Sequence, residues 1–199
     1  MKKKLLLAGL TFAVIAVTWI PGAAGQILER KQIKPVLVVM DVQNKWMPFM
    51  SEGDRNTAPG KINELIALFR EFGHPVIKVY HSDPERGPEP GTEQFEFPSS
   101  IDVTDDDMGL VKEHASAFTK TDLERILKED GKNTVFLCGL SATGCVLATY
   151  FGALEREFMV LMVEGTLLSH DASHTKVIED ICSSMTLEEV RETLEDPYL

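Results

Sequence analysis

Short apolar runs alternate with helical segments along most of the chain, and this alternation limits how it can fold. The run PVLVVMD, residues 35–41, is continuous and rich in β-branched residues, which is typical of a strand buried on both faces. Further strands are expected at 75–81, 109–112, 133–139 and 158–165. Helices are expected over 59–72, 120–131, 141–157, 171–182 and 184–196. The sequence therefore predicts an α/β fold with three α/β/α layers and a mainly parallel, Rossmann-like sheet.

The first 25 residues have the pattern of a secretory signal peptide. A basic start, MKKK, precedes the apolar run 5–20 and the small residues PGAAG. Cleavage is expected near Ala24 or Gly25, which leaves 26–199 as one domain of an exported, periplasmic or secreted protein. The alternative is an uncleaved membrane anchor, although the apolar run is slightly short for a full span.

The chain is acidic, with 20 Lys and Arg against 31 Asp and Glu and a formal net charge of −11. Loss of the signal segment would remove three of the lysines. Such a surface repels nucleic acid and anionic membranes. We therefore expect a small-molecule substrate, no nucleic-acid partner and no stable membrane span after cleavage.

Three polar residues stand where a predicted strand ends or a helix begins: Asp41, Lys112 and Cys145. In an open α/β sheet, ligands bind at the carboxyl ends of the strands. Backbone N–H groups at a helix start favour a thiolate at Cys145 and could hold an oxyanion. Each residue alone has an ordinary structural explanation: a helix cap, an edge-strand lysine and a packed thiol. Only their convergence indicates an enzyme.

The segments VLVVMDVQ, VKEHASAFTKTDL and CGLSATGCVLAT resemble, in this order, those of isochorismatase-like cysteine hydrolases, which include nicotinamidases and N-carbamoylsarcosine amidases. The resemblance runs from about residue 35 to residue 194, and the last two segments are fairly specific. The positions that match family motifs are Asp41 with Gln43, Lys112 before Ser116 to Phe118, and Gly139 before Cys145 and Val146.

By this resemblance, Asp41, Lys112 and Cys145 form a triad that cleaves a C–N bond of a small amide or ureido substrate through an acyl-enzyme. The family also has a non-proline cis peptide before its cysteine, which here falls at Leu140–Ser141. That bond would turn the Ser141 N–H toward the oxyanion, beside that of Cys145. The resemblance further implies a homo-oligomer, and we expect no cofactor.

Metal ligands are the point at which the chain departs from the nicotinamidases. Those enzymes carry an Asp and paired His after the second strand, whereas this chain offers only His81 and Asp83 there. A single His lacks the partners of a metal site, so His81 is predicted at the pocket rim. His170 and His174 have i,i+4 spacing around a residue suited to a helix cap, and a helix start is the simpler explanation. No metal site is therefore expected.

Five side chains in or near the strand ends could line the substrate pocket. They are Gln43, Trp46, Phe49, His81 and Phe118. The long irregular stretch 82–109 is predicted to help determine specificity, because such loops are usually functional or mobile. Cys138 and Cys182 are interpreted as packing residues, and a disulfide between them is left open.

Two other functions fit the same sequence. One is an isochorismate-type vinyl-ether hydrolase, a chemistry that needs no cysteine nucleophile in the family. The other is a non-catalytic binding or assembly protein on the same fold, which the predicted export and the risk of thiol oxidation would favour.

Overall fold

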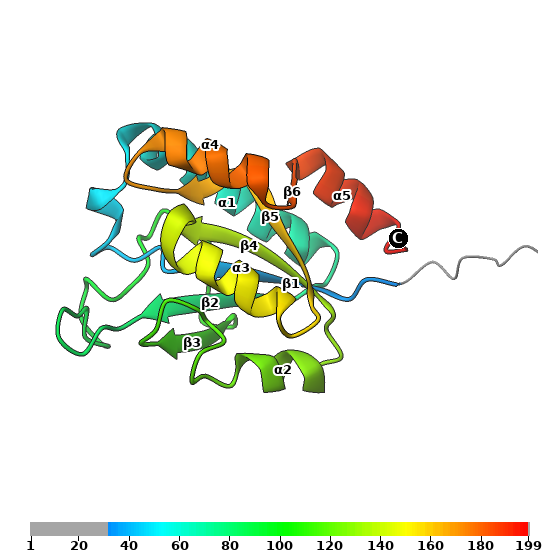
Figure 1. The fold of residues 1–199 in the computed structure, drawn as a ribbon, viewed down its shortest axis with the longest axis horizontal. Helices are drawn as coiled ribbons and strands as arrows, with labels where there is room; N and C mark the ends of the chain where they lie inside the picture. Colours follow the sequence, from blue (N-terminus) through cyan, green and yellow to red (C-terminus); the bar gives the residue numbers. More distant parts are fainter. Residues whose placement is uncertain (1–31, 199) are drawn as a thin grey trace, which may run out of the picture. The chain divides into compact units, whose positions relative to one another are not determined.

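A computed structural model describes residues 32–198. Its centre is one six-stranded, fully parallel sheet with the strand order β3-β2-β1-β4-β5-β6 (Figure 1). The strands are β1 (Pro35–Met40), β2 (Val76–His81), β3 (Met108–Lys112), β4 (Thr134–Leu140), β5 (Met159–Leu168) and β6 (Ser184–Met185). Every residue of β1 and of β4 is buried, as their continuous apolar sequences predict. The predicted three-layer α/β/α class is confirmed.

Helices cover both faces of the sheet. The first face is covered by α1 (Glu52–Glu71) and α5 (Leu187–Glu195), and the second by α2 (Leu123–Glu129), α3 (Leu147–Leu154) and α4 (Ala172–Ile181) (Figure 1). Two short turns complete the order: η1 (Met47–Phe49) is a 3-10 turn and η2 (Ala142–Val146) is a π-helical turn. Each face has its own apolar core, because the side chains of a strand point alternately to the two sides.

The start of α1 differs from the sequence prediction. Pro59 suggests a helix start, since proline is favoured in the first turn, but the helix already begins at Glu52. The hydroxyl of Ser51 caps it by accepting a hydrogen bond from the Asp54 N–H at 3.1 Å. At the start of α5, Thr186 and Glu189 form a capping box.

In the part of the chain that the structure describes, no helix is both long and apolar enough to cross a membrane. The predicted signal segment, residues 1–25, lies outside the described residues.

Candidate active site

The strand order creates a switch point between β1 and β4. The chain leaves β1 toward the face covered by α1 and leaves β4 toward the face covered by α3. The two connections therefore diverge, and a crevice opens beyond the carboxyl ends of these strands, where ligands bind in folds of this kind. Asp41 follows β1, and the turn that carries Cys145 follows β4.

Asp41 sits at a close approach of the two central strands. Its φ of 53° lies in the left-handed region, which Asp tolerates better than most residues. Met40 is in register with Gly139, whose φ is 106°. A Cβ added at Gly139 would lie 2.2 Å from the Met40 carbonyl oxygen, so only glycine fits there. Gly139 thus allows β4 to pack directly against the strand end that presents Asp41.

Lys112 and Asp41 form a buried ion pair. Nζ of Lys112 lies 2.7 Å from Oδ2 of Asp41, and the two side chains are 0% and 2% exposed. The same ammonium lies 3.1 Å from Nδ1 of His81, because His81 and Lys112 are paired in register on β2 and β3. Burial raises the pKa of Asp41. The charge of Lys112 and the contact between the Asp41 carboxylate and the Cys145 thiol act to lower this pKa. Burial and the nearby Lys112 lower the pKa of His81.

Cys145 is partly buried beside this pair. One ligand-type atom each of Asp41, His81 and Cys145 lies within 4.8 Å of the others. Burial raises the pKa of the thiol to about 12, and the Asp41 carboxylate adds to that rise while Lys112 opposes it. The sequence argument from a helix start predicts a lowered pKa, but the desolvation and the neighbouring carboxylate outweigh it. This environment therefore favours the neutral thiol over the thiolate.

The bond between Leu140 and Ser141 is a non-proline cis peptide, at the position that the family resemblance indicates. Both residues line the same cavity as Cys145. The π-helical turn that follows contains a kink at Gly144, and the Gly144 N–H donates to the Ser141 carbonyl at 2.9 Å.

A cavity of about 340 Å³ opens in front of these groups. Of the pocket residues that the sequence suggests, Trp46, Phe49 and His81 line it. Two further wall residues, Met50 and His170, were not predicted. His170 comes from the far end of the chain, and no local pattern connects it with Phe49. In the structure its Nδ1 donates to the Phe49 carbonyl at 2.9 Å, which joins the two sides of the wall.

The buried carboxylate of Asp54, also absent from the sequence interpretation, supports this wall from behind. Its Oδ2 accepts hydrogen bonds from the Ser169 N–H and the Thr175 hydroxyl, each at 2.9 Å. The Ser51 N–H donates to the Ser169 carbonyl at 2.7 Å. These bonds fix the start of α1 to the loop that carries His170.

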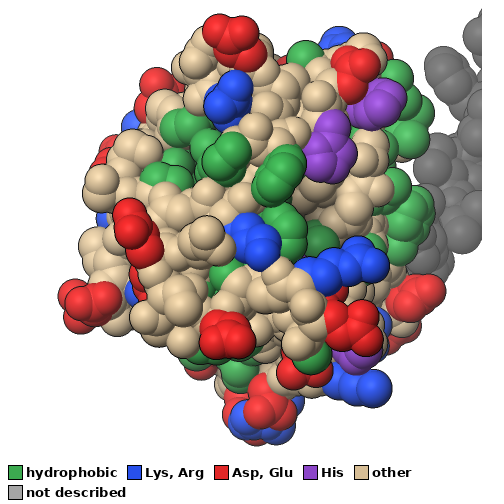
Figure 2. Space-filling model, turned by 90° about the vertical axis from the view of Figure 1, so that its left-hand side faces the viewer, with side chains coloured by type: hydrophobic (Ala, Val, Ile, Leu, Met, Phe, Trp, Pro, Cys, Tyr) green, Lys and Arg blue, Asp and Glu red, His purple; other side chains and the backbone are tan. Residues whose placement is uncertain are grey.

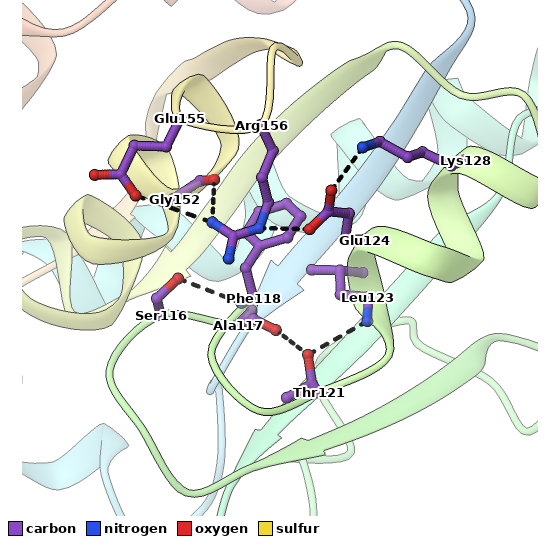
Figure 3. Close-up of polar contacts among 10 residues, drawn as sticks. All are labelled: Ser116, Ala117, Phe118, Thr121, Leu123, Glu124, Lys128, Gly152, Glu155 and Arg156. Atoms are coloured by element: carbon purple, nitrogen blue, oxygen red, sulfur yellow. Dashed lines mark hydrogen bonds and ion pairs between the residues drawn. The ribbon is translucent and has the colours of Figure 1, made fainter.

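Two predicted pocket residues do not line the cavity. Gln43 is fully buried, and its amide donates to the carbonyl oxygens of His81 and Phe95 while accepting from the His81 N–H, so it fixes His81 in place. Phe118 packs in the core of the second face, with its ring centroid 5.8 Å from that of Phe158. The Arg156 guanidinium carbon lies 5.2 Å from the centroid of the Phe118 ring (Figure 3). The motif places Phe118 near Lys112 in sequence, but its side chain packs under α3.

The long segment 82–107 supports the site without lining it. The rings of Tyr80 and Phe95 stack 4.7 Å apart, and the Asn44 N–H donates to the Glu96 carbonyl at 2.9 Å. No cavity residue comes from this described segment. The prediction that it contributes directly to specificity is therefore not supported, because its aromatic side chains are used for packing.

Asp41, His81 and Cys145 are the one group of three potential metal ligands found in residues 32–198. The Lys112 ammonium contacts both the carboxylate and the imidazole, so a cation held there would lie against a positive charge. All three cysteines are free thiols, and Cys138 and Cys182 pack on opposite faces of the sheet, which rules out the disulfide left open above.

Comparison with known proteins agrees with this geometry. The profile of the isochorismatase domain matches residues 35–195. The chain belongs to the isochorismatase family. Members of this family are hydrolases, and the resemblance noted in the sequence is confirmed.

Individual relatives are similar at moderate identity. The uncharacterized isochorismatase family protein YecD of Escherichia coli O157:H7 is 29% identical over 190 residues, which cover 84% of this chain and all of YecD. The secreted isochorismatase effector Isc1 of Verticillium dahliae is 25% identical over 68% of this chain and 73% of its own length. The structure of N-carbamoylsarcosine amidase from Thermoplasma acidophilum has a TM-score of 0.67 and 29% identity, and the match covers 77% of this chain and 95% of that one.

Proposed function

We propose that this protein is a cysteine hydrolase that cleaves the C–N bond of a small amide or ureido compound. The observation that supports the proposal is the meeting of Asp41, Lys112 and Cys145 at one wall of a cavity, although they lie far apart in sequence. The similarity to N-carbamoylsarcosine amidase supports the same reaction type.

In the proposed mechanism, Asp41 accepts the thiol proton while the Cys145 sulfur attacks the substrate carbonyl carbon. The oxyanion is held by the backbone N–H groups of Ser141 and Cys145. Asp41 then gives the proton to the leaving nitrogen, the C–N bond breaks and ammonia or an amine departs. A water molecule attacks the thioester, Asp41 takes its proton, and the C–S bond breaks to release the acid and restore the thiol.

The high pKa of the Cys145 thiol makes a base necessary. Burial raises the pKa of Asp41, which makes this carboxylate a better proton acceptor than an exposed one. The charge of Lys112 opposes that rise and so favours the ionised carboxylate, and it also favours the developing thiolate. Neutral His81 accepts a hydrogen bond from Lys112 and so orients the ammonium.

The test is ammonia release from a panel of simple amides and ureides. We expect Cys145→Ala and Asp41→Asn to abolish turnover, whereas Cys182→Ala, which changes a free cysteine outside the cavity, should leave it intact. Mass spectrometry of rapidly quenched enzyme should find the acyl group on the peptide that contains Cys145. Turnover that persists in Cys145→Ala would refute the covalent route.

The same experiment separates the other functions. A vinyl-ether hydrolase would act on its substrate in the Cys145→Ala variant. A non-catalytic binding protein would turn over no substrate and would never carry an acyl group on Cys145. The raised thiol pKa fits that second alternative when considered alone, so turnover is the decisive readout, not thiol titration.

We also propose that residues 1–25 direct export and are removed near Ala24. The support is the signal-like sequence together with the similarity to a secreted relative. Sequencing the N-terminus of protein recovered outside the cytoplasm should find residue 25 or 26 first, and an intact Met1 would contradict cleavage.

A homo-oligomer is the third part of the proposal. Large apolar side chains are exposed on α3 and α4, on the same face of the sheet, with Phe151 53% and Ile181 69% exposed. We expect light scattering to find an oligomer that Ile181→Glu weakens. A monomer at all concentrations would contradict this part alone.

A further inference from the structure

The cavity in front of Cys145 has mostly apolar and aromatic walls, and the basic side chains among its described lining residues are two histidines, His81 and His170. One ring nitrogen of each is already in use, since Nδ1 of His81 lies 3.1 Å from the Lys112 ammonium and Nδ1 of His170 donates to the Phe49 carbonyl. Among the described residues, those that line it include Trp46, Phe49, Met50 and Leu140, with no Lys or Arg. The nearest charge pair is internal, since Lys112 is 0% exposed and already bound to Asp41. The reacting groups therefore contribute no net positive charge toward a substrate.

Lys and Arg side chains lie on the face around the cavity, but none of those described lines it (Figure 2). On the face at the carboxyl ends of the strands, hydrophobic side chains gather near the centre, with basic and His side chains beside them (Figure 2). Lys45, next to Trp46 in the chain, does not line the cavity. Its ammonium lies 5.4 Å from the centroid of the Trp46 ring and donates to the Arg86 carbonyl. The Lys45 ammonium is therefore already held by the Trp46 ring and the Arg86 carbonyl, outside the cavity.

From these observations we propose that the substrate is an uncharged amide with an apolar acyl group, and that the enzyme rejects amides whose acyl group carries a carboxylate. This inference rests on the proposed hydrolase function. A carboxylate that enters this largely apolar cavity loses its hydration and finds no Lys or Arg to pair with, which is a large cost. The net charge of −11 also disfavours the approach of an anion.

A matched pair of probes tests the proposal. In 4-methylpentanamide an isopropyl group replaces the carboxylate of succinamate, so the two amides have nearly the same shape and differ in charge. We expect kcat/KM for ammonia release to be at least about 100-fold higher for 4-methylpentanamide, because a site without a partner for a buried polar group discriminates strongly. Equal rates, or a preference for succinamate, would overturn the proposal.

A cation placed at the cavity mouth should reverse the discrimination. Phe49 is 61% exposed, so its replacement is not expected to prevent folding. Phe49→Arg should raise kcat/KM for succinamate relative to 4-methylpentanamide by at least about 10-fold, since the guanidinium can pair with the carboxylate. Phe49→Leu, the matched apolar control, should leave the ratio near that of the wild type. An unchanged ratio in Phe49→Arg would show that a missing cation is not the reason for selectivity.

The outcomes distinguish this inference from the function on which it rests. If the wild type hydrolyses amides but prefers carboxylates, the substrate class is wrong and the hydrolase proposal stands. If it hydrolyses no amide or ureide in the wider panel, the proposed function fails and the inference fails with it.

Discussion

The buried pair of Asp41 and Lys112 offers a direct test of how the site is held together. Their charged atoms are 2.7 Å apart and almost fully buried. Coulomb's law with an effective dielectric constant of about 20 gives an attraction of about 6 kcal/mol at this distance. Removal of one partner leaves an uncompensated charge in the interior, which typically costs about 3–5 kcal/mol. Removal of both partners leaves no uncompensated charge in the interior.

We therefore expect Asp41→Asn and Lys112→Met each to lower the free energy of unfolding by about 3–5 kcal/mol at neutral pH. The double variant should be more stable than either single variant. Urea unfolding followed by circular dichroism gives the free energy of unfolding of all three variants. The dependence of that free energy on urea concentration should stay the same in each variant if only stability changes.

An exposed pair in the same chain is the control. Arg191 and Glu71 form two hydrogen bonds at 2.9 Å, with side chains 47% and 54% exposed. The two single variants and the double variant of each pair form a double-mutant cycle. The cycle with Glu71→Gln and Arg191→Met should give a coupling energy below about 1 kcal/mol, because solvent screens the pair. If the Asp41–Lys112 cycle also gives less than about 1 kcal/mol of coupling, the buried pair does not behave as argued.

Three further predictions follow from the site. Burial raises the pKa of Asp41, which must be ionised to accept a proton, so kcat/KM should fall with decreasing pH through a value above the 3.8 of an ordinary Asp; a pH–rate profile with a lower acid limb would contradict this. Asp54→Ala should lower the free energy of unfolding by about 1–3 kcal/mol and raise KM, because Ser169 and Thr175 lose their acceptor. Asp54→Asn keeps an acceptor oxygen, so its unfolding free energy in urea and its steady-state KM should stay close to those of the wild type. Nε1 of Trp46 is buried without a hydrogen-bond partner among the described residues, so the thermal midpoint of Trp46→Phe should equal or exceed that of the wild type; a fall of 5 °C would show that the indole has a stabilising partner.

The sequence predicted the central strands and the gathering of polar groups at their ends, because both depend on local patterns. Continuous apolar runs indicated β1 and β4, and the residues after them had to meet at one edge of a parallel sheet. The start of α1 was misplaced because Pro59 in the sequence suggests a first turn, whereas the actual cap is Ser51.

Other features could not be read from local patterns, since they depend on tertiary contacts. The raised thiol pKa of Cys145 comes from burial and from a carboxylate more than a hundred positions away. The contributions of His170 and Asp54 depend on contacts between the loop at residues 169–170 and the region around the start of α1, which are far apart in sequence. Phe118 was assigned to the pocket from its place in a motif, but the direction of its side chain is set by packing against Phe158.

The cavity wall and the reacting groups belong to different parts of the chain. Asp41, Lys112 and Cys145 are held at the ends of the strands or in the turn after β4, while four other cavity residues come from elsewhere: Trp46, Phe49, Met50 and His170. Under the proposed function, mutagenesis libraries confined to these four residues would change which amide is accepted while the proposed proton-transfer groups stay unaltered. Recognition and bond cleavage can in this way evolve separately, which makes the molecule a practical starting point for engineering.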